Sequence, residues 1–425
     1  PIPAELDHEP QVMRDELKRR SEGTDRERDV LERQLHDWSS GFMDRLAQSR
    51  QVLMLAEPLV SLDPSIRSKG HLAHLGGWVP ARQVSDLERR LGEALTQPFE
   101  LTSRDPRPDE RRLVPTVPVR SRLLEPFAML VKQYGIPQYG EVDPTPLFAV
   151  TFLLMFGSMF GDVGQGAVIA AAAWWLRAKL GRFYLFGVMA GLSSIVFGFL
   201  FGSIFGYEHV LPALWMSPLQ DPILMLTIAL GWGVLFLVMA CTLAIYNRLV
   251  IHNWSGAVFG HHGLVNLVFY LALVWSGLNL AAGRAVGAAP TLLVAAALGL
   301  LAWHGWRHLD APVGEKILVV FIETLETIIG YVSNTLSFLR VAAFSLNHVA
   351  LAIAIFTLAE MMGAFGHLVT IVIGNLFMIV LEGGIVMIQV LRLEFYEGFA
   401  RYFSGDGHEF APLKLRRGTK GGQAT

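Results

Sequence analysis

Four polar residues recur at intervals of seven in one of the most apolar parts of the sequence: Glu326, Ser333, Arg340 and Asn347. Because seven residues are nearly two turns of an α-helix, these side chains should lie along one slowly drifting stripe. The surrounding run, residues 315–361, contains no proline that would break a helix. An arginine at membrane depth is costly, so Arg340 should face protein, water or a carboxylate rather than lipid.

A second polar pattern has the same interval in the last apolar run. Glu382, Gln389 and Tyr396 are seven residues apart, and Arg392 follows Gln389 by almost one turn. Two neighbouring helices therefore each carry an arginine and at least one carboxylate. Such a group is either a neutralised pair that fixes helix register or a polar relay in which carboxylates exchange protons beside fixed positive charges. His348 would suit an aqueous half-channel, and a hydrogen-bonded packing role explains it equally well.

The composition indicates a membrane protein. Of the 425 residues, 52% are hydrophobic and 17% are charged, whereas soluble domains carry about 25% charged residues. A net charge of −2 gives no reason to expect nucleic acid as a partner. The single cysteine, Cys241, excludes a disulfide framework and a cysteine metal site. The sequence has no Walker A pattern, so we expect it to hydrolyse nothing itself. We also expect no catalytic residue, resident metal or cofactor.

Charged residues concentrate in the first quarter of the chain, and apolar runs dominate the rest. We predict a charged helix with one apolar seam, a small lobe, a proline-rich linker, an amphipathic approach to the membrane, a transmembrane domain and a tail. Their expected boundaries are 1–60, 61–98, 99–122, 123–145, 146–403 and 404–425.

Seven apolar runs follow the approach segment: 147–176, 183–205, 223–246, 264–280, 291–306, 317–361 and 368–403. Since one span needs about 20 residues, the runs 147–176 and 317–361 are each either two helices or one long helix. Seven or eight crossings result, and eight is favoured if both termini share one side. Basic residues predict that this side is cytoplasmic; they are Arg177, Lys179, Arg182, Lys414, Arg416 and Arg417. The predicted fold is therefore an all-α membrane protein of about eight transmembrane helices, with two long tilted helices at its C-terminal end. A small cytoplasmic coiled-coil or α+β part should precede them.

Three long motifs occur in order, EVDPTPLFAVTFLLMFGSMFGDVGQG, ETLETIIGYVSNTLSFLRVAAFSLNHVAL and VLEGGIVMIQVLRLEFYEGFARYF. With these motifs and HLGGWVP, the chain resembles the large membrane subunit of rotary V-type and archaeal-type ATPases, called subunit a or subunit I. The resemblance implies a non-catalytic stator subunit with two half-channels for H⁺ or Na⁺, while ATP chemistry belongs to other subunits. The implied partners are a rotating ring of proteolipid c-type subunits, a central-stalk cap subunit of d/C type, peripheral-stalk subunits of E/G type and the lipid membrane.

The same resemblance implies roles for individual residues. Arg340, in its SFLR context, would face the ion-binding carboxylate of the ring, and Arg392 matches a second arginine at that interface. Glu382 matches a half-channel glutamate, and Glu326 and His348 match polar channel-lining positions. Asn347, Ser333 and Gln389 join the ion-translocation set because they lie on the two polar patterns.

For the GDVGQG motif we favour helix capping or packing over a channel role; its structural residues are Gly161, Asp162 and Gly166. The alternative to a stator subunit is a standalone ion-coupled transporter with Arg340 and Arg392 in a substrate site. A purely structural membrane anchor is a third possibility.

Family members usually begin with a longer cytoplasmic region. Against that pattern the chain is expected to be N-terminally incomplete, with residues 1–60 as the returning helix of a coiled coil and residues 61–98 as a membrane-proximal lobe. The expected location is a plasma membrane of bacterial or archaeal type, with multiple spans and both termini cytoplasmic.

Overall fold

The computed structural model describes residues 10–62, 66–69, 72–107, 110–117, 121–207, 212–309 and 312–412. The chain is mostly helical and divides into two compact units, residues 1–84 with 411–425 and residues 85–410. The basic residues predicted to mark the cytoplasmic tail, Lys414, Arg416 and Arg417, lie outside the described residues.

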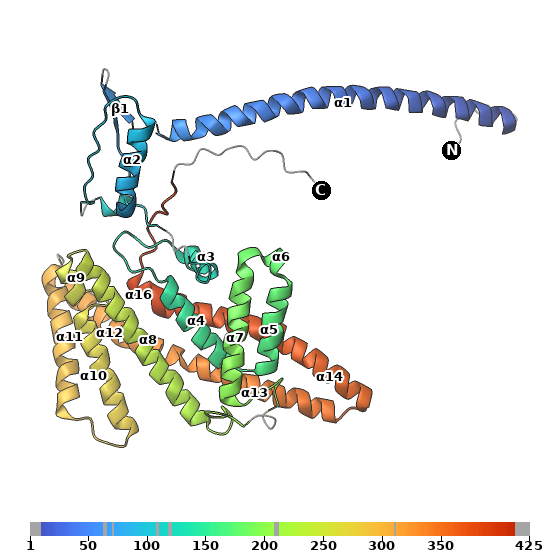
Figure 1. The fold of residues 1–425 in the computed structure, drawn as a ribbon. Helices are drawn as coiled ribbons and strands as arrows, with labels where there is room; N and C mark the ends of the chain where they lie inside the picture. The colour runs from blue at the N-terminus through green and yellow to red at the C-terminus, as the bar shows by residue number, and fades with distance from the viewer. Residues whose placement is uncertain are drawn as a thin grey trace. The chain divides into compact units, whose positions relative to one another are not determined.

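The first unit contains one long helix and a short hairpin (Figure 1). Helix α1 (Pro10–Leu62) is 53 residues long, and residues 1–9 of the charged helix predicted for residues 1–60 lie outside the described residues. Apolar side chains of its seam are exposed, as at Leu31, Leu35 and Leu53. Strand β1 (Ile66–Lys69) pairs antiparallel with β2 (Leu72–Leu75), with Ile66 opposite Leu75. Pairing of α1 in a coiled coil remains a prediction.

The second unit begins with short elements that precede the apolar helices. Helix α2 (Val84–Ala94) follows a 3₁₀ turn that belongs to the first unit (Ala81–Gln83), and α3 (Glu125–Tyr134) buries Phe127 against the membrane helices. The described residues between them include a 3₁₀ turn (Arg111–Leu113).

The last described residues of the second unit return to this entry region. Thr116 forms a bridge with Glu409, Ile136 forms one with Asp406, and Lys132 makes an ion pair of 2.7 Å with Glu409. The end of the predicted linker is therefore fastened to the chain that follows the last helix.

Six helical segments of the described residues are long and apolar enough to cross a membrane: Arg177–Phe201, Pro222–Val250, Trp254–Ala281, Ala288–His308, Val313–Glu360 and Ala364–Tyr402. Two shorter apolar helices precede them, α4 (Thr145–Met159) and α5 (Val163–Trp175). The first apolar run is therefore two helices, because the chain leaves helical geometry at Phe160 and is capped again by Asp162.

The six segments comprise eleven further helices: α6 (Arg177–Leu180), α7 (Tyr184–Phe201), α8 (Pro222–Val250), α9 (Trp254–Phe259), α10 (Leu264–Ala281), α11 (Ala288–His308), α12 (Val313–Ser337), α13 (Leu339–Glu360), α14 (Ala364–Phe377), α15 (Gly383–Arg392) and α16 (Ala400–Tyr402). A 3₁₀ turn (Gly181–Phe183) joins α6 to α7. Helices α5 and α7 pack side by side, as do α10 with α11 and α13 with α14 (Figure 1).

Small residues and aromatic rings hold these helices together. A Cβ on Gly166 would lie 2.8 Å from the Gly191 carbonyl oxygen, so this pair lets α5 and α7 approach closely. Rings from α3, α4, α7 and the last helical segment form one cluster, in which Phe148 lies 5.6 Å from Phe399. The last segment is thereby fixed against α4, and this contact sets the position of its polar side chains.

Candidate functional site

The helix that carries Arg340 is broken two residues before it. Helix α12 ends at Ser337 and α13 begins at Leu339, while Phe338 makes i to i+3 backbone hydrogen bonds with Thr335 and Val341. The fully buried Phe338 ring packs 5.3 Å from Phe236 of α8. A tight 3₁₀ turn of this kind within a long helix often marks a functional hinge.

The polar stripe continues across this break. Glu326, Ser333 and Asn347 are exposed, and Arg340 is half-buried. Glu326, Ser333 and Asn347 thus lie on a side of α12 and α13 that other described helices leave uncovered, whereas Arg340 is partly covered. The break therefore does not disrupt the stripe predicted from the seven-residue interval.

The positive charge of Arg340 is not neutralised by an ion pair with any described residue. Its Nη1 atom is buried without a hydrogen-bond partner. It interacts electrostatically with Arg392 and Glu397 of the last helical segment, yet among the described residues no carboxylate lies within the 4.0 Å of an ion pair. An arginine cannot discharge by losing its proton. The site is therefore suited to attract an additional carboxylate.

The last helical segment contains two π-helical turns. Residues Met378–Glu382 form the first, between α14 and α15, and residues Leu393–Phe399 form the second, between α15 and α16. Turns of this kind are rare and occur frequently at functional sites. Here they include Glu382, Glu394 and Glu397, and Arg392 directly precedes the second one.

The first π-turn places Glu382 against His348 of α13. The His348 Nδ1 and Glu382 Oε2 atoms are 3.0 Å apart, and the two residues are only 2% and 3% exposed. The other polar atom of each group, His348 Nε2 and Glu382 Oε1, is buried without a hydrogen-bond partner in the described residues. The sequence did not predict that these two residues form a direct pair.

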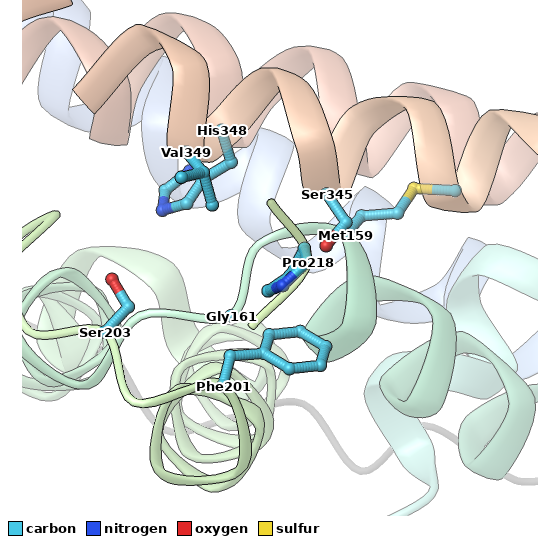
Figure 2. A pocket seen from close by; sticks show the side chains of 8 residues that line it. All are labelled: Met159, Gly161, Phe201, Ser203, Pro218, Ser345, His348 and Val349. Atoms are coloured by element: carbon cyan, nitrogen blue, oxygen red, sulfur yellow. The ribbon is translucent and has the colours of Figure 1, made fainter. Parts of the chain in front are cut away.

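A small cavity adjoins this pair (Figure 2). The cavity volume is about 10 Å³, which is near the minimum that holds one water molecule. Figure 2 shows Ser345, His348 and Val349 directed from α13 toward Phe201 and Ser203. The cavity is thus reached by His348, while Glu382 is not among its lining residues.

Comparison with known proteins identifies the family of this chain. The sequence profile described as the V-type ATPase 116kDa subunit family matches residues 64–184 and 304–415, which is more than half of the chain. The chain belongs to this family.

Named relatives are also found. The A-type ATP synthase subunit I of Thermococcus kodakarensis is 27% identical over 81% of this chain and 54% of its own length. The protein of the same name from Aeropyrum pernix is 26% identical over 90% of this chain and 63% of its own length. A V-type ATP synthase subunit I 2 of Treponema pallidum is 33% identical over 35% of this chain and 36% of its own length. The chain thus spans little more than half the length of the archaeal relatives.

The polar residues of the last helical segment that the sequence analysis singled out differ in their exposure. Glu382 is buried, Gln389 is half-buried with an unpartnered Oε1 atom, and Arg392 and Tyr396 are exposed. The seven-residue interval of Glu382, Gln389 and Tyr396 therefore does not give them equal exposure. Tyr396 lies within the second π-turn, which adds one residue to a turn and so rotates Tyr396 relative to Gln389.

Asp162 has a well-defined structural position. Its carboxylate accepts hydrogen bonds from the backbone N–H groups of Gln165, Phe205 and Gly206 and from the Ser203 hydroxyl, at 2.7–2.9 Å. It is fully buried and caps α5. Phe205 and Gly206 both have positive φ, 48° and 81°, so this turn aims successive N–H groups at one anion.

The neighbouring glycines are required by close packing. A Cβ on Gly161 would lie 2.6 Å from the Phe201 ring, and one on Gly166 would lie 2.7 Å from the Ser194 hydroxyl. In this geometry Gly161, Asp162 and Gly166 hold α4, α5 and α7 together.

Sequence reasoning missed three charged residues of the second π-turn region. Glu394, Glu397 and Arg401 are 1%, 5% and 7% exposed. The Arg401 guanidinium lies over the Tyr331 ring at 4.9 Å and near the Cys241 sulfur at 3.8 Å. The sequence does contain a pattern that could have identified them. The three charged residues are spaced three and four apart within an apolar run, which places them on one helix face.

Proposed function

We propose that this chain is the membrane subunit of the stator of a rotary V/A-type ATPase and that it provides two half-channels for H⁺ or Na⁺. In this proposal it has no catalytic residue, because ATP hydrolysis or synthesis takes place in other subunits. Family membership and the names of the archaeal relatives support this assignment.

The observation that carries the proposal is the state of Arg340. It lies half-buried in a segment that is long and apolar enough to cross a membrane, on the polar stripe, with a buried Nη1 atom that lacks a partner among the described residues. An ion-binding carboxylate on a moving neighbour would complete this charge. At an effective dielectric constant of about 20 and a separation of about 4 Å, such a pair gains roughly 4 kcal/mol. That gain would offset much of the cost of deprotonating an acid in a bilayer.

Further polar groups lie on either side of Arg340 along the helix. His348 with Glu382 is about 12 Å away along α13, and Glu326 is about 21 Å away in the opposite direction. Ions would reach the arginine region along one group and leave along the other. Arg340 would keep the two paths from joining, since its permanent positive charge repels a free cation.

The proposed partners follow from this arrangement and from the family. The external carboxylate would belong to a ring of proteolipid c-type subunits in the lipid membrane. A central-stalk cap subunit of d/C type and peripheral-stalk subunits of E/G type would complete the assembly. Helices α4 and α5 with the six longer segments would give eight crossings, with α1 as the returning helix of a cytoplasmic coiled coil. Both termini would then be cytoplasmic in a plasma membrane of bacterial or archaeal type.

The test is ATP-driven ion pumping by vesicles that contain the whole complex. Arg340→Gln should abolish pumping while assembly is intact, and Arg340→Lys should retain little because it loses the forked guanidinium. The matched control is Arg307→Gln, which removes an exposed arginine that lies over Trp303 at the end of α11 and should pump normally. Normal pumping by Arg340→Gln would refute the proposal, and transport by the purified chain alone would favour a standalone transporter.

A further inference from the structure

The second π-turn buries a carboxylate that the ion path described above does not use. Glu397 is 5% exposed, and its Oε2 atom has no hydrogen-bond partner in the described residues. Arg401, one turn further on, donates from Nε to the Glu397 carbonyl oxygen at 3.1 Å. This bond helps to fix the backbone of the π-turn and hence the direction of the Glu397 side chain.

The surroundings of Glu397 connect it to both candidate arginines. The Ser337 hydroxyl, at the end of α12, lies beside its carboxylate, and Arg340 and Arg392 both interact with it electrostatically. The two arginines also interact with each other. Arg401 is a further nearby charge, and its guanidinium is held over Tyr331, with Nη1 3.5 Å from His262 Nδ1.

The charges of Arg340, Arg392 and Glu397 determine how strongly this group binds an external carboxylate. Arg340 and Arg392 contribute two fixed positive charges to the polar face, and an ionised Glu397 contributes one negative charge. These three residues together then carry a net charge of +1, and this charge attracts an external carboxylate. Without Glu397, two unopposed positive charges would hold that carboxylate more strongly and delay its release.

We propose that Glu397 is a positioning residue that reduces the arginine pair to one net positive charge, so that the pair both captures and releases a single ring carboxylate in each step. This inference rests on the proposed function. It assigns Glu397 no contact with the transported ion and no proton transfer. Its role is to set how strongly Arg340 and Arg392 stabilise the ionised form of the passing acid.

The experiment measures ATP-driven pumping by the assembled complex as a function of pH. Glu397→Gln makes the arginine pair more positive and lowers the pKa of the ring carboxylate, so its reprotonation requires a lower pH. The pumping optimum should move to lower pH by about one unit, the lower end of the effect of one nearby charge. Glu397→Asp keeps the charge and should retain the native optimum.

Two further variants make the test decisive. Glu394→Gln is the matched control, because it removes the neighbouring buried carboxylate, which lies beside Thr151; its optimum should stay native. Arg392→Gln removes a positive charge and should shift the optimum to higher pH, which tests the charge count even if Glu397→Gln fails to assemble. An unchanged optimum in either Glu397→Gln or Arg392→Gln, or an equal shift in Glu394→Gln, would overturn the inference. Normal pumping by Arg340→Gln would instead overturn the proposed function.

Discussion

The buried carboxylate of Asp162 offers a quantitative test of how the first two apolar helices are held. It accepts four hydrogen bonds, two of which reach the turn at Phe205 and Gly206. Asp162→Asn keeps the shape of the side chain but replaces one acceptor oxygen with an NH₂ donor. The amide oxygen can still accept two bonds, and the Ser203 hydroxyl can rotate to accept from the new NH₂ group. The Gly206 N–H group is then left facing a donor.

The expected loss follows from these changes. Leaving one buried N–H group unsatisfied costs about 1–3 kcal/mol, and converting the remaining bonds from charged to neutral acceptors costs roughly another 1 kcal/mol in total. We therefore expect Asp162→Asn to destabilise the protein by about 3 kcal/mol. Asp162→Ala should cost more, because it leaves all four donors without this acceptor.

The assay is thermal unfolding of the purified protein in detergent. Asp221→Asn is a suitable control, since Asp221 is exposed at the start of α8 and its side chain makes no capping bond; it should change stability by no more than about 0.5 kcal/mol. The assembled fraction of Asp162→Asn should pump at the native rate per complex. Native stability combined with lost pumping would refute the capping account and favour a channel role.

Two other outcomes are expected outside the Arg340 region. Hydrogen bonds from Arg104 and from the Arg107 backbone lower the pKa of Glu110 from 4.5 to about 2. The ionised Glu110 carboxylate therefore stabilises the folded protein fully above pH 4.5, and this stabilisation is lost as the pH falls through 2. A carboxyl NMR titration should give that midpoint, and Arg104→Gln should move it toward 4.5; an unmoved midpoint would contradict this. Gln165→Leu removes a 2.9 Å bond from Gln165 Nε2 to the Asn375 side chain, which joins α5 to α14, and should cost about 1–2 kcal/mol in the same unfolding assay. No change would show that the bond contributes nothing.

The sequence predicted features that depend on local periodicity. Three residues of the predicted stripe, Glu326, Ser333 and Asn347, are exposed and Arg340 is half-buried, because α12 and α13 together keep nearly the spacing of one helix despite the break at Phe338. The interruption at the GDVGQG motif also separates two helices, since glycine and aspartate favour such a break. Both results follow from properties of adjacent residues.

Features that depend on tertiary contacts were not predictable in this way. The π-turns at Glu382 and Glu397 have no distinct signature in apolar periodicity, and they decide which face each side chain occupies. The contact of His348 with Glu382 joins residues 34 positions apart, and its formation depends on how α13 packs on the last segment. Burial of Arg401 likewise depends on the Tyr331 ring of a different helix.

The most direct test of the central claim is whether the Arg340 side of α13 faces the ring. Ala343 is exposed, while its neighbour Ala342 is 0% exposed, and the only native cysteine, Cys241, is buried. Single cysteines at these two positions can be paired with a cysteine placed one turn from the ring carboxylate, in complexes that pump before oxidation. The account expects a disulfide from position 343 and none from position 342. Cross-linking at neither position, or equally at both, would contradict it.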